Sequence, residues 1–215
     1  MNNLITVTGM VLEVHPVNDY DRRLVILTKE RGKITAFCRG ARRINNKMMA
    51  ATNQFAFGNF KLFEGKNAYN LADAEITNYF EELRDDLDGA FLGMYFLEVA
   101  SYYTRENNDE MQMLKLLYQS VKAIVKKTLD NRLVRSVYEI KTLVINGEFP
   151  GADVRLSDTV KYAIDFIINS KVESLYTFTL TEEAIAEIAD FASRTIKKYT
   201  DRPFKSLELV DVNLI

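Results

Sequence analysis

The hydrophobic pattern changes its period near residue 80, and this change limits the folds open to the 215-residue chain. Before it, short runs rich in Val, Ile, Thr and Phe alternate apolar with polar residues, as strands do. After it, apolar residues recur at the three- and four-residue spacing of helices. We therefore predict an α+β protein with a β domain over residues 1–79 and a helical domain over residues 80–215.

Five strand-like runs occupy the first domain, over residues 4–14, 22–29, 33–39, 55–63 and 69–76. Gly9 lies inside the first run, and a glycine within a strand indicates a bulge or a tight bend of the kind that small barrels need. A short turn at residues 30–32 predicts a hairpin between the second and third runs. This pattern predicts a small five-stranded barrel of the OB type, with an SH3-like barrel as the nearest alternative.

Five helices are expected after residue 80. The first, near residues 87–102, is apolar nearly all round and is predicted to be a buried central helix. The third is expected to stop near Gly147 and Pro150, and the fourth to begin at Ser157. Thr179 and Glu182 have capping-box spacing and should open the fifth helix. The tail over residues 202–215 contains Pro203 and is expected to be extended.

Basic residues are concentrated in the first domain, although the whole chain carries a net charge of −2. Residues 22–47 hold nine basic residues and one acid, and the first domain is positive while the second is negative. A dense basic block in a strand-rich region of an acidic chain indicates a face for a polyanion.

The run over residues 33–39 separates two kinds of side chain. Ile34, Ala36 and Cys38 share one face and should enter a core, while cations and Phe37 share the other. Cations neutralise phosphates and an aromatic ring can stack on a base, so this face and the next loop predict a single-strand binding surface. The alternative is a solvated edge strand protected by its charges. The candidate DNA-binding residues are Arg22, Arg23, Lys33, Phe37, Arg39, Arg42, Arg43 and Lys47.

The other chemistry-bearing residues do not predict an enzyme. With Cys38 as the single cysteine and His15 as the single histidine, neither a multi-cysteine zinc site nor a recognisable catalytic triad can be assembled. Asp85, Asp86 and Asp88 precede a long helix, where carboxylates favour the N-terminus, so we expect capping and no metal. No cofactor is expected.

The N-terminal residues lack the basic segment and apolar run of a signal peptide. No run approaches the about 18 apolar residues that a membrane span needs. We therefore expect a cytoplasmic protein with no membrane partner.

Several short motifs, taken in order, resemble the RecO family of bacterial recombination mediators. They are VTGMVLEV, DYDRRLVILTKERGKI, RGARR, QFAFGNFKLFEG, VYEIKTLVINGEFP and RPFKSLEL. The fifth is similar to the family's FEL-LLxxxGxxP segment and the last to its G-x-PLKSREL tail. Each motif is modest alone, but their order and spacing are specific and cover essentially the whole chain.

The resemblance implies an OB-fold domain followed by a helical domain. It also implies binding to single- and double-stranded DNA and annealing of complementary strands in recombinational repair, without a chemical step. RecR and single-strand-binding protein are the implied partners, and the implied location is the bacterial cytoplasm, associated with the nucleoid. The resemblance also implies that Arg39, Arg42 and Arg43 of the RGARR segment contact DNA, together with Lys33 on the preceding strand.

Two departures from the family pattern concern metal and partner binding. Many members carry a four-cysteine zinc site after the GxxP segment, but residues 151–180 contain no cysteine, so zinc should be absent. The arginine before the FEL-like motif is displaced by one residue, to Arg135. A receptor for the acidic tail of single-strand-binding protein needs an apolar pocket rimmed by cations. Arg132 and Arg135 are the candidates; the alternative is that both are solvated.

Two classes of function therefore stay open. The favoured one is a non-enzymatic mediator that binds and anneals DNA. The alternative is a protein-interaction adaptor whose barrel is mainly a docking module, with incidental DNA contact. A steep dependence of DNA affinity on salt would favour the mediator, because phosphate contacts release counterions.

Overall fold

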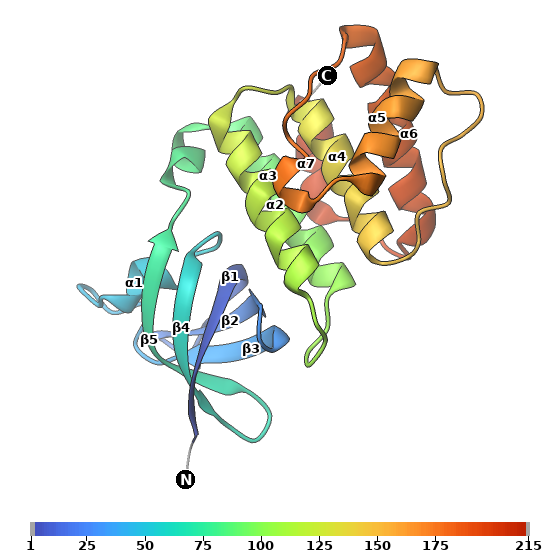
Figure 1. The fold of residues 1–215 in the computed structure, drawn as a ribbon. Coiled ribbons are helices and arrows are strands. Elements are labelled where there is room, and N and C mark those ends of the chain that lie inside the picture. Colours follow the sequence, from blue (N-terminus) through green and yellow to red (C-terminus); the bar gives the residue numbers. More distant parts are fainter. Residues whose placement is uncertain (1–2, 214–215) are drawn as a thin grey trace. The chain divides into compact units, whose positions relative to one another are not determined.

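A computed structural model describes residues 3–213 of the protein. Its first 78 residues contain five strands: β1 (Leu4–Val17), β2 (Asp21–Thr28), β3 (Gly32–Cys38), β4 (Phe57–Glu64) and β5 (Tyr69–Asn78). They close into a barrel in the order β1-β2-β3-β5-β4, with β3 and β5 parallel and the other pairs antiparallel (Figure 1). The short helix α1 (Met48–Ala51) lies between β3 and β4 in sequence. The predicted five-stranded barrel of the OB type is confirmed.

Strand β1 is long because it serves two neighbours. Its first half pairs with β4 and its second half with β2, and Gly9 is paired with both. A Cβ at Gly9 would lie 2.4 Å from the carbonyl oxygen of Leu27, so a larger residue would force the strands apart. The register shifts at Leu12, between Val11 and Glu13. The bulge predicted for this strand is present, but at Leu12, whereas Gly9 is the position where both neighbouring strands pair with β1.

Alternation along the strands fills the barrel core. Ile34 and Ala36 of β3 are buried with Leu24, Ile26 and Phe60, as predicted. Cys38 is also buried, in a smaller cluster with Ala41 and the α1 residues Met48 and Ala51. Helix α1 thus packs apolar side chains against the C-terminal end of β3.

The chain divides into two compact units. The first holds the residues up to Glu81 and also Ala100–Leu114, and the second holds Glu82–Val99 and Lys115 onwards. The segment 100–114 joins the barrel through backbone bonds, in which Lys33 N–H donates to Arg105 O and Asn107 N–H donates to Arg31 O, each at 2.9 Å. The hydroxyl of Ser101 also donates to the Glu13 carboxylate at 2.6 Å. A helical connection is therefore part of the barrel unit.

The helices after the barrel are α2 (Leu87–Tyr103), α3 (Met111–Lys126), α4 (Asn131–Ile145), α5 (Asp158–Asn169), α6 (Glu182–Tyr199) and α7 (Lys205–Asn213). Single 3-10 turns cover Glu81–Asp85 and Val172–Ser174. Helix α4 packs against both α5 and α6 and is buried along most of residues 133–143. The buried rings of Phe96 in α2 and Tyr138 in α4 stack with centroids 4.0 Å apart. The prediction that α2 is largely buried is confirmed, and α4 is equally central.

Two predicted helix boundaries are wrong. Helix α6 is capped by Thr181, whose hydroxyl accepts the Ala184 N–H at 3.4 Å, and not by Thr179. Glu182 is the first residue of this helix and not its third, so it cannot form a capping box with Thr181, and its carboxylate binds Arg132 instead. The tail is not extended either, since residues 205–213 form α7. The Glu98 carboxylate of α2 accepts the Ser206 N–H at 2.9 Å, which supplies a partner for an N-terminal amide of α7 from a distant part of the sequence.

No helix among residues 3–213 has both the length and the apolar character needed to cross a membrane.

Candidate nucleic-acid interface

The outer face of β2 and β3 carries Arg23 and Phe37 directly opposite each other. Their neighbours Leu24 and Ala36 are paired in the barrel core, so alternation directs Arg23 and Phe37 outward. Phe37 is also paired with Asn70 of β5. A cation, a ring and an amide therefore follow one another across three strands.

The RGARR loop after β3 is held beside the β1–β2 turn by backbone contacts. Gly40 N–H donates to the Asp21 carboxylate at 2.7 Å, and Arg42 N–H donates to Tyr20 O at 2.8 Å. The Asn46 amide donates to Gly40 O at 2.7 Å. Gly40 has φ +65°, a conformation that glycine adopts without a Cβ penalty. None of these bonds uses an arginine side chain, so the loop's shape is independent of its guanidinium groups.

The guanidinium groups of this loop are directed to solvent. Arg39, Arg42 and Arg43 are all exposed. The Arg43 guanidinium lies 5.3 Å from the centroid of the Tyr20 ring, and Arg42 Nη1 donates a long, 3.4 Å bond to Asn18 O. Within residues 3–213, neither Arg23 nor Arg39 has an ion pair or a side-chain hydrogen bond. We define the barrel cation surface as Tyr20, Arg23, Phe37, Arg39, Arg42 and Arg43.

Three of the predicted DNA-binding residues lie elsewhere or are already engaged. Arg22 Nη1 donates to Met49 O, Thr52 Oγ1 and Asn53 Oδ1 at 2.8–3.0 Å, which ties β2 to α1. Burial, and then the nearby charge of Arg42, lowers the pKa of Arg22.

The Lys33 ammonium donates to the carbonyl oxygen of Ser101, where the helical connection joins the barrel. Lys47 forms an exposed ion pair with Asp73 at 2.9 Å. The structure therefore brings five predicted residues together in the barrel cation surface and gives Arg22, Lys33 and Lys47 intramolecular partners.

Sequence reasoning did not select Tyr20, Phe63, Lys66 or Asn70. Phe63 is 38% exposed on β4 and is paired with Asn70, on the other side of Asn70 from Phe37. A hollow of about 300 Å³ is lined by Phe37, Arg39, Phe63, Asn70 and Leu71. Tyr20 could have been found as an aromatic residue within a polar turn, but no local signal identifies Phe63 or Asn70, because their proximity to Phe37 depends on the β3–β5 pairing.

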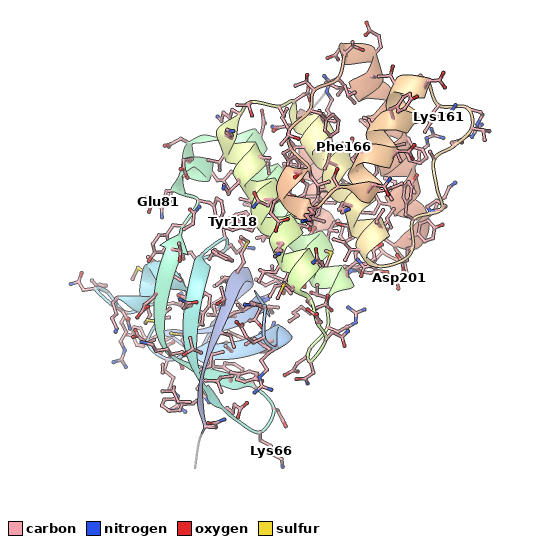
Figure 2. The ribbon with its side chains drawn as sticks, in the orientation of Figure 1. Lys66, Glu81, Tyr118, Lys161, Phe166 and Asp201 are labelled. Carbon is pink, nitrogen blue, oxygen red and sulfur yellow. The ribbon has the colours of Figure 1, made fainter. Side chains whose placement is uncertain are left out.

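The β4–β5 loop adds one further cation. Figure 2 shows Lys66 on this loop, extending away from the strands, and it is exposed. Loops at this position, together with β2 and β3, form the usual oligonucleotide-binding face of an OB-fold.

The two arginines predicted to bind an acidic tail are engaged within the second unit. Arg132 binds the Glu182 carboxylate with two nitrogens at 2.7 and 2.8 Å and also binds Asp130 at 2.6 Å. The Asp130 and Glu182 carboxylates raise the pKa of Arg132. Arg135 donates to the buried Glu139 carboxylate at 2.8 Å, and its side chain is only 12% exposed. Their role as a receptor stays a prediction, but these contacts do not favour it.

A hollow of about 330 Å³ in the second unit has the composition that such a receptor needs. Tyr95, Phe204 and Leu207 contribute apolar surface, and Lys197 and Arg202 contribute cations. Asp201, labelled in Figure 2, is also in its lining. Arg135 lies 5.3 Å from the Tyr95 ring centroid, so it supports one wall of this hollow.

The remaining candidates have structural roles. Asp86 accepts the Gly89 N–H at 3.1 Å at the start of α2 and pairs with Lys127, which confirms the capping prediction for Asp86. His15 Nε2 lies 3.0 Å from Glu13. Cys38 is buried, and burial raises the pKa of its thiol to about 11. Across the part of the chain that the structure describes, no three His, Cys, Asp or Glu side chains are grouped to hold a metal.

Known proteins resemble this chain over both units. A family model described as "Recombination protein O N terminal" matches residues 1–80. The chain is 22% identical to the DNA repair protein RecO of Acetivibrio thermocellus, over 97% of this chain and 96% of that protein. It is 23% identical to the protein of the same name from Clostridium perfringens strain 13, over 96% and 97%. Its counterpart in Symbiobacterium thermophilum is 32% identical over 68% of this chain and 58% of that protein.

Proposed function

This chain belongs to the RecO family of DNA repair proteins, and we propose that it acts as a recombination mediator that binds single- and double-stranded DNA and anneals complementary strands. No chemical step is proposed. Annealing needs a surface that neutralises the phosphates of two strands and releases the product once the bases have paired. Contacts to phosphates satisfy both requirements, because they are independent of sequence and are weakened by salt.

The barrel cation surface is the observation that carries this proposal. Its four arginines project from one strand face and one adjoining loop, and none of them has a carboxylate partner of its own among residues 3–213. Lys47 shows the contrast, because Asp73 already neutralises it. Unpaired cations on an OB barrel fit a polyanion better than they fit an ordinary solvated surface.

The aromatic members extend the surface to unpaired bases. Phe37 is placed between Arg23 and Asn70 in the strand pairing, and Tyr20 lies under Arg43. A base can stack on an exposed ring while neighbouring cations bind its phosphates. Duplex DNA has no free base faces, so it would be held by the cations alone, which explains how one surface can accept both forms.

RecR and single-strand-binding protein are the protein partners that we propose. For the acidic, phenylalanine-terminated tail of the latter, the hollow lined by Tyr95, Phe204 and Lys197 is a better receptor than Arg132. The hollow can bury a ring, and Lys197 is exposed at its rim, while Arg132 is occupied by two carboxylates. If the protein were instead a protein-interaction adaptor, it would need to bind these partners but not DNA.

The proposal is tested by annealing complementary oligonucleotides coated with single-strand-binding protein. The wild-type chain should accelerate annealing, and the Arg39→Ala, Arg42→Ala, Arg43→Ala triple variant should lose most of that acceleration. A triple variant at Lys126, Lys171 and Lys198 removes the same charge from exposed positions of the second unit and should retain it. Wild-type protein that neither binds DNA nor anneals it would support the adaptor instead.

A further inference from the structure

The hollow at the β3–β5 junction of the barrel is a built feature of the first unit, lined by Phe37, Arg39, Phe63, Asn70 and Leu71. We propose that it is a seat for one unpaired base of a single strand, with the base in contact with the Phe37 and Phe63 rings and hydrogen-bonded by Asn70. The inference rests on the proposed DNA-binding function and adds to it a subsite at which the base itself is bound.

The hollow lies where the pairing that closes the barrel, between β3 and β5, is short. Strands β3 and β5 are paired at only two positions, Ala36 with Tyr69 and Phe37 with Asn70. Strand β3 ends at Cys38, so no further strand pairing with β5 covers the surface beyond Phe37 and Asn70. On the other side of β5, Asn70 is paired with Phe63. Asn70 is therefore central in an outward row with one ring on each side.

Both rings are open to a ligand. Within the described chain, neither Phe37 nor Phe63 makes a ring–ring or cation–π contact. Tyr20 differs, because the Arg43 guanidinium already lies over its ring. Exposing Phe63 to water is unfavourable by the hydrophobic effect, so covering it with a flat apolar group would stabilise the complex.

The polar groups of the hollow match a base attached to a phosphate. Asn70 is exposed, and its amide offers two donors and an acceptor that no residue among 3–213 satisfies. Arg39 has the planar guanidinium that binds a phosphate with two hydrogen bonds. Leu71 supplies an apolar lining and packs against the barrel core. An apolar side chain of a protein partner would leave Asn70 and Arg39 without partners.

The size of the hollow limits the occupant. Its volume of about 300 Å³ is at the lower end of the range of ligand pockets, roughly 300–1,000 Å³. It is therefore suited to one base and not to a stretch of duplex, whose bases are inaccessible inside the helix. The expected consequence is a preference for strands that carry bases over an otherwise equal backbone without them.

The experiment compares two oligonucleotides of equal length and charge, oligo-dT and a strand of abasic sites, by fluorescence anisotropy at several salt concentrations. The wild-type chain should bind oligo-dT more tightly. Phe63→Ala should weaken binding to oligo-dT by about fivefold or more, the lower limit for losing one base stack, without changing binding to the abasic strand. Its salt slope should stay the same, because no phosphate contact is lost.

Two further variants guard against an effect of misfolding. Phe63→Leu keeps the apolar bulk but removes the ring, so it should also weaken binding to oligo-dT while leaving the melting temperature close to wild type. Tyr162→Ala removes a 78% exposed ring from α5 in the second unit and should change neither affinity. A strand carrying 2-aminopurine should show quenching on wild type and less quenching on Phe63→Leu.

Three results would overturn the inference. An equal affinity of wild type for the two strands would show that no base is bound, and an unchanged preference in both Phe63 variants would show that the base is bound elsewhere. Both results leave the proposed DNA binding intact if the salt slope is steep. Absence of binding to either strand would remove the inference and the proposed function together.

Discussion

The salt dependence of DNA binding is the property that the barrel cation surface should control most directly. The perturbation is the triple variant Arg39→Ala, Arg42→Ala, Arg43→Ala, which removes only exposed guanidinium groups. Each phosphate contact contributes about 0.9 to the slope of log affinity against log salt on duplex DNA and about 0.7 on single strands. If each arginine holds one phosphate, the slope should fall by about 2.7 on duplex and about 2.1 on single strands.

The same figures predict affinities at two salt concentrations. Raising the salt from roughly 50 to 200 mM weakens single-strand binding by some factor in each protein. With a slope smaller by about 2.1, this factor should be about 18 times smaller for the variant than for wild type. The loss should be similar for all sequences, because phosphate contacts do not distinguish bases.

The fold should tolerate the triple change, because main-chain bonds from Gly40 and Arg42 hold the loop. The interactions lost are the 3.4 Å contact to Asn18 O and the stacking of Arg43 on Tyr20, and an exposed cation–π contact contributes about 0.5–1 kcal/mol.

Fluorescence anisotropy across a salt series provides the measurement, and the second-unit triple variant at Lys126, Lys171 and Lys198 controls for net charge. A cooperatively folded Arg39/Arg42/Arg43 variant with the wild-type affinity and slope would refute the assignment. If the two triple variants lost affinity equally, only net charge would matter and the surface would have no special role.

Three other measurements test contacts described above. Arg22→Ala should lower the free energy of unfolding in urea by about 1–3 kcal/mol, because Met49, Thr52 and Asn53 lose their hydrogen bonds from a half-buried cation. The DNA salt slope should change little, and the opposite result would return Arg22 to the interface. Native Cys38 should react with a thiol reagent at pH 8 only as fast as the protein opens, because its thiol is buried and its pKa is about 11. Rapid labelling of the folded protein would contradict this. Because the pKa of Cys38 is raised above the ordinary 9.0, the stability contributed by the neutral thiol should be complete below pH 9.0 and lost as the pH rises through about 11. Urea unfolding measured at a series of pH values tests this, with Cys38→Ser as the control. Lys197→Ala should weaken binding of a labelled acidic peptide ending in phenylalanine, whereas Arg132→Ala should leave it near wild type; the reverse pattern would restore the arginine as the receptor.

Local patterns were sufficient to predict the architecture. The period of two before residue 80 and the period near 3.6 after it are properties of neighbouring residues, so the barrel and the helices followed from them. The same holds for the alternation of β3, with Ile34 and Ala36 inside and Phe37 outside, and for the basic character of the loop that follows. Burial of Cys38 was predictable for this reason as well.

Helix ends were less predictable, because their partners come from distant segments. Two threonines near residue 180 have capping chemistry, and the choice of Thr181 over Thr179 accompanies the ion pair between Glu182 and Arg132 of another helix. Helix α7 begins two residues after Pro203, and Glu98 of α2 accepts the N–H of its second residue, Ser206. Such a contact leaves no trace in the local sequence.

Which cations are available to bind a ligand was decided by the tertiary structure alone. Arg22 and Arg23 are adjacent in the sequence, but alternation sends one toward α1 and leaves the other outside. Lys33 was assigned to the open face, but the helical connection that joins the barrel takes its ammonium. Likewise, Phe37 and Phe63 flank one hollow only because β5 pairs with both of their strands. Composition and periodicity specify how many charges and rings a segment presents, whereas the long-range pairing of strands and helices determines which of them remain free for a ligand.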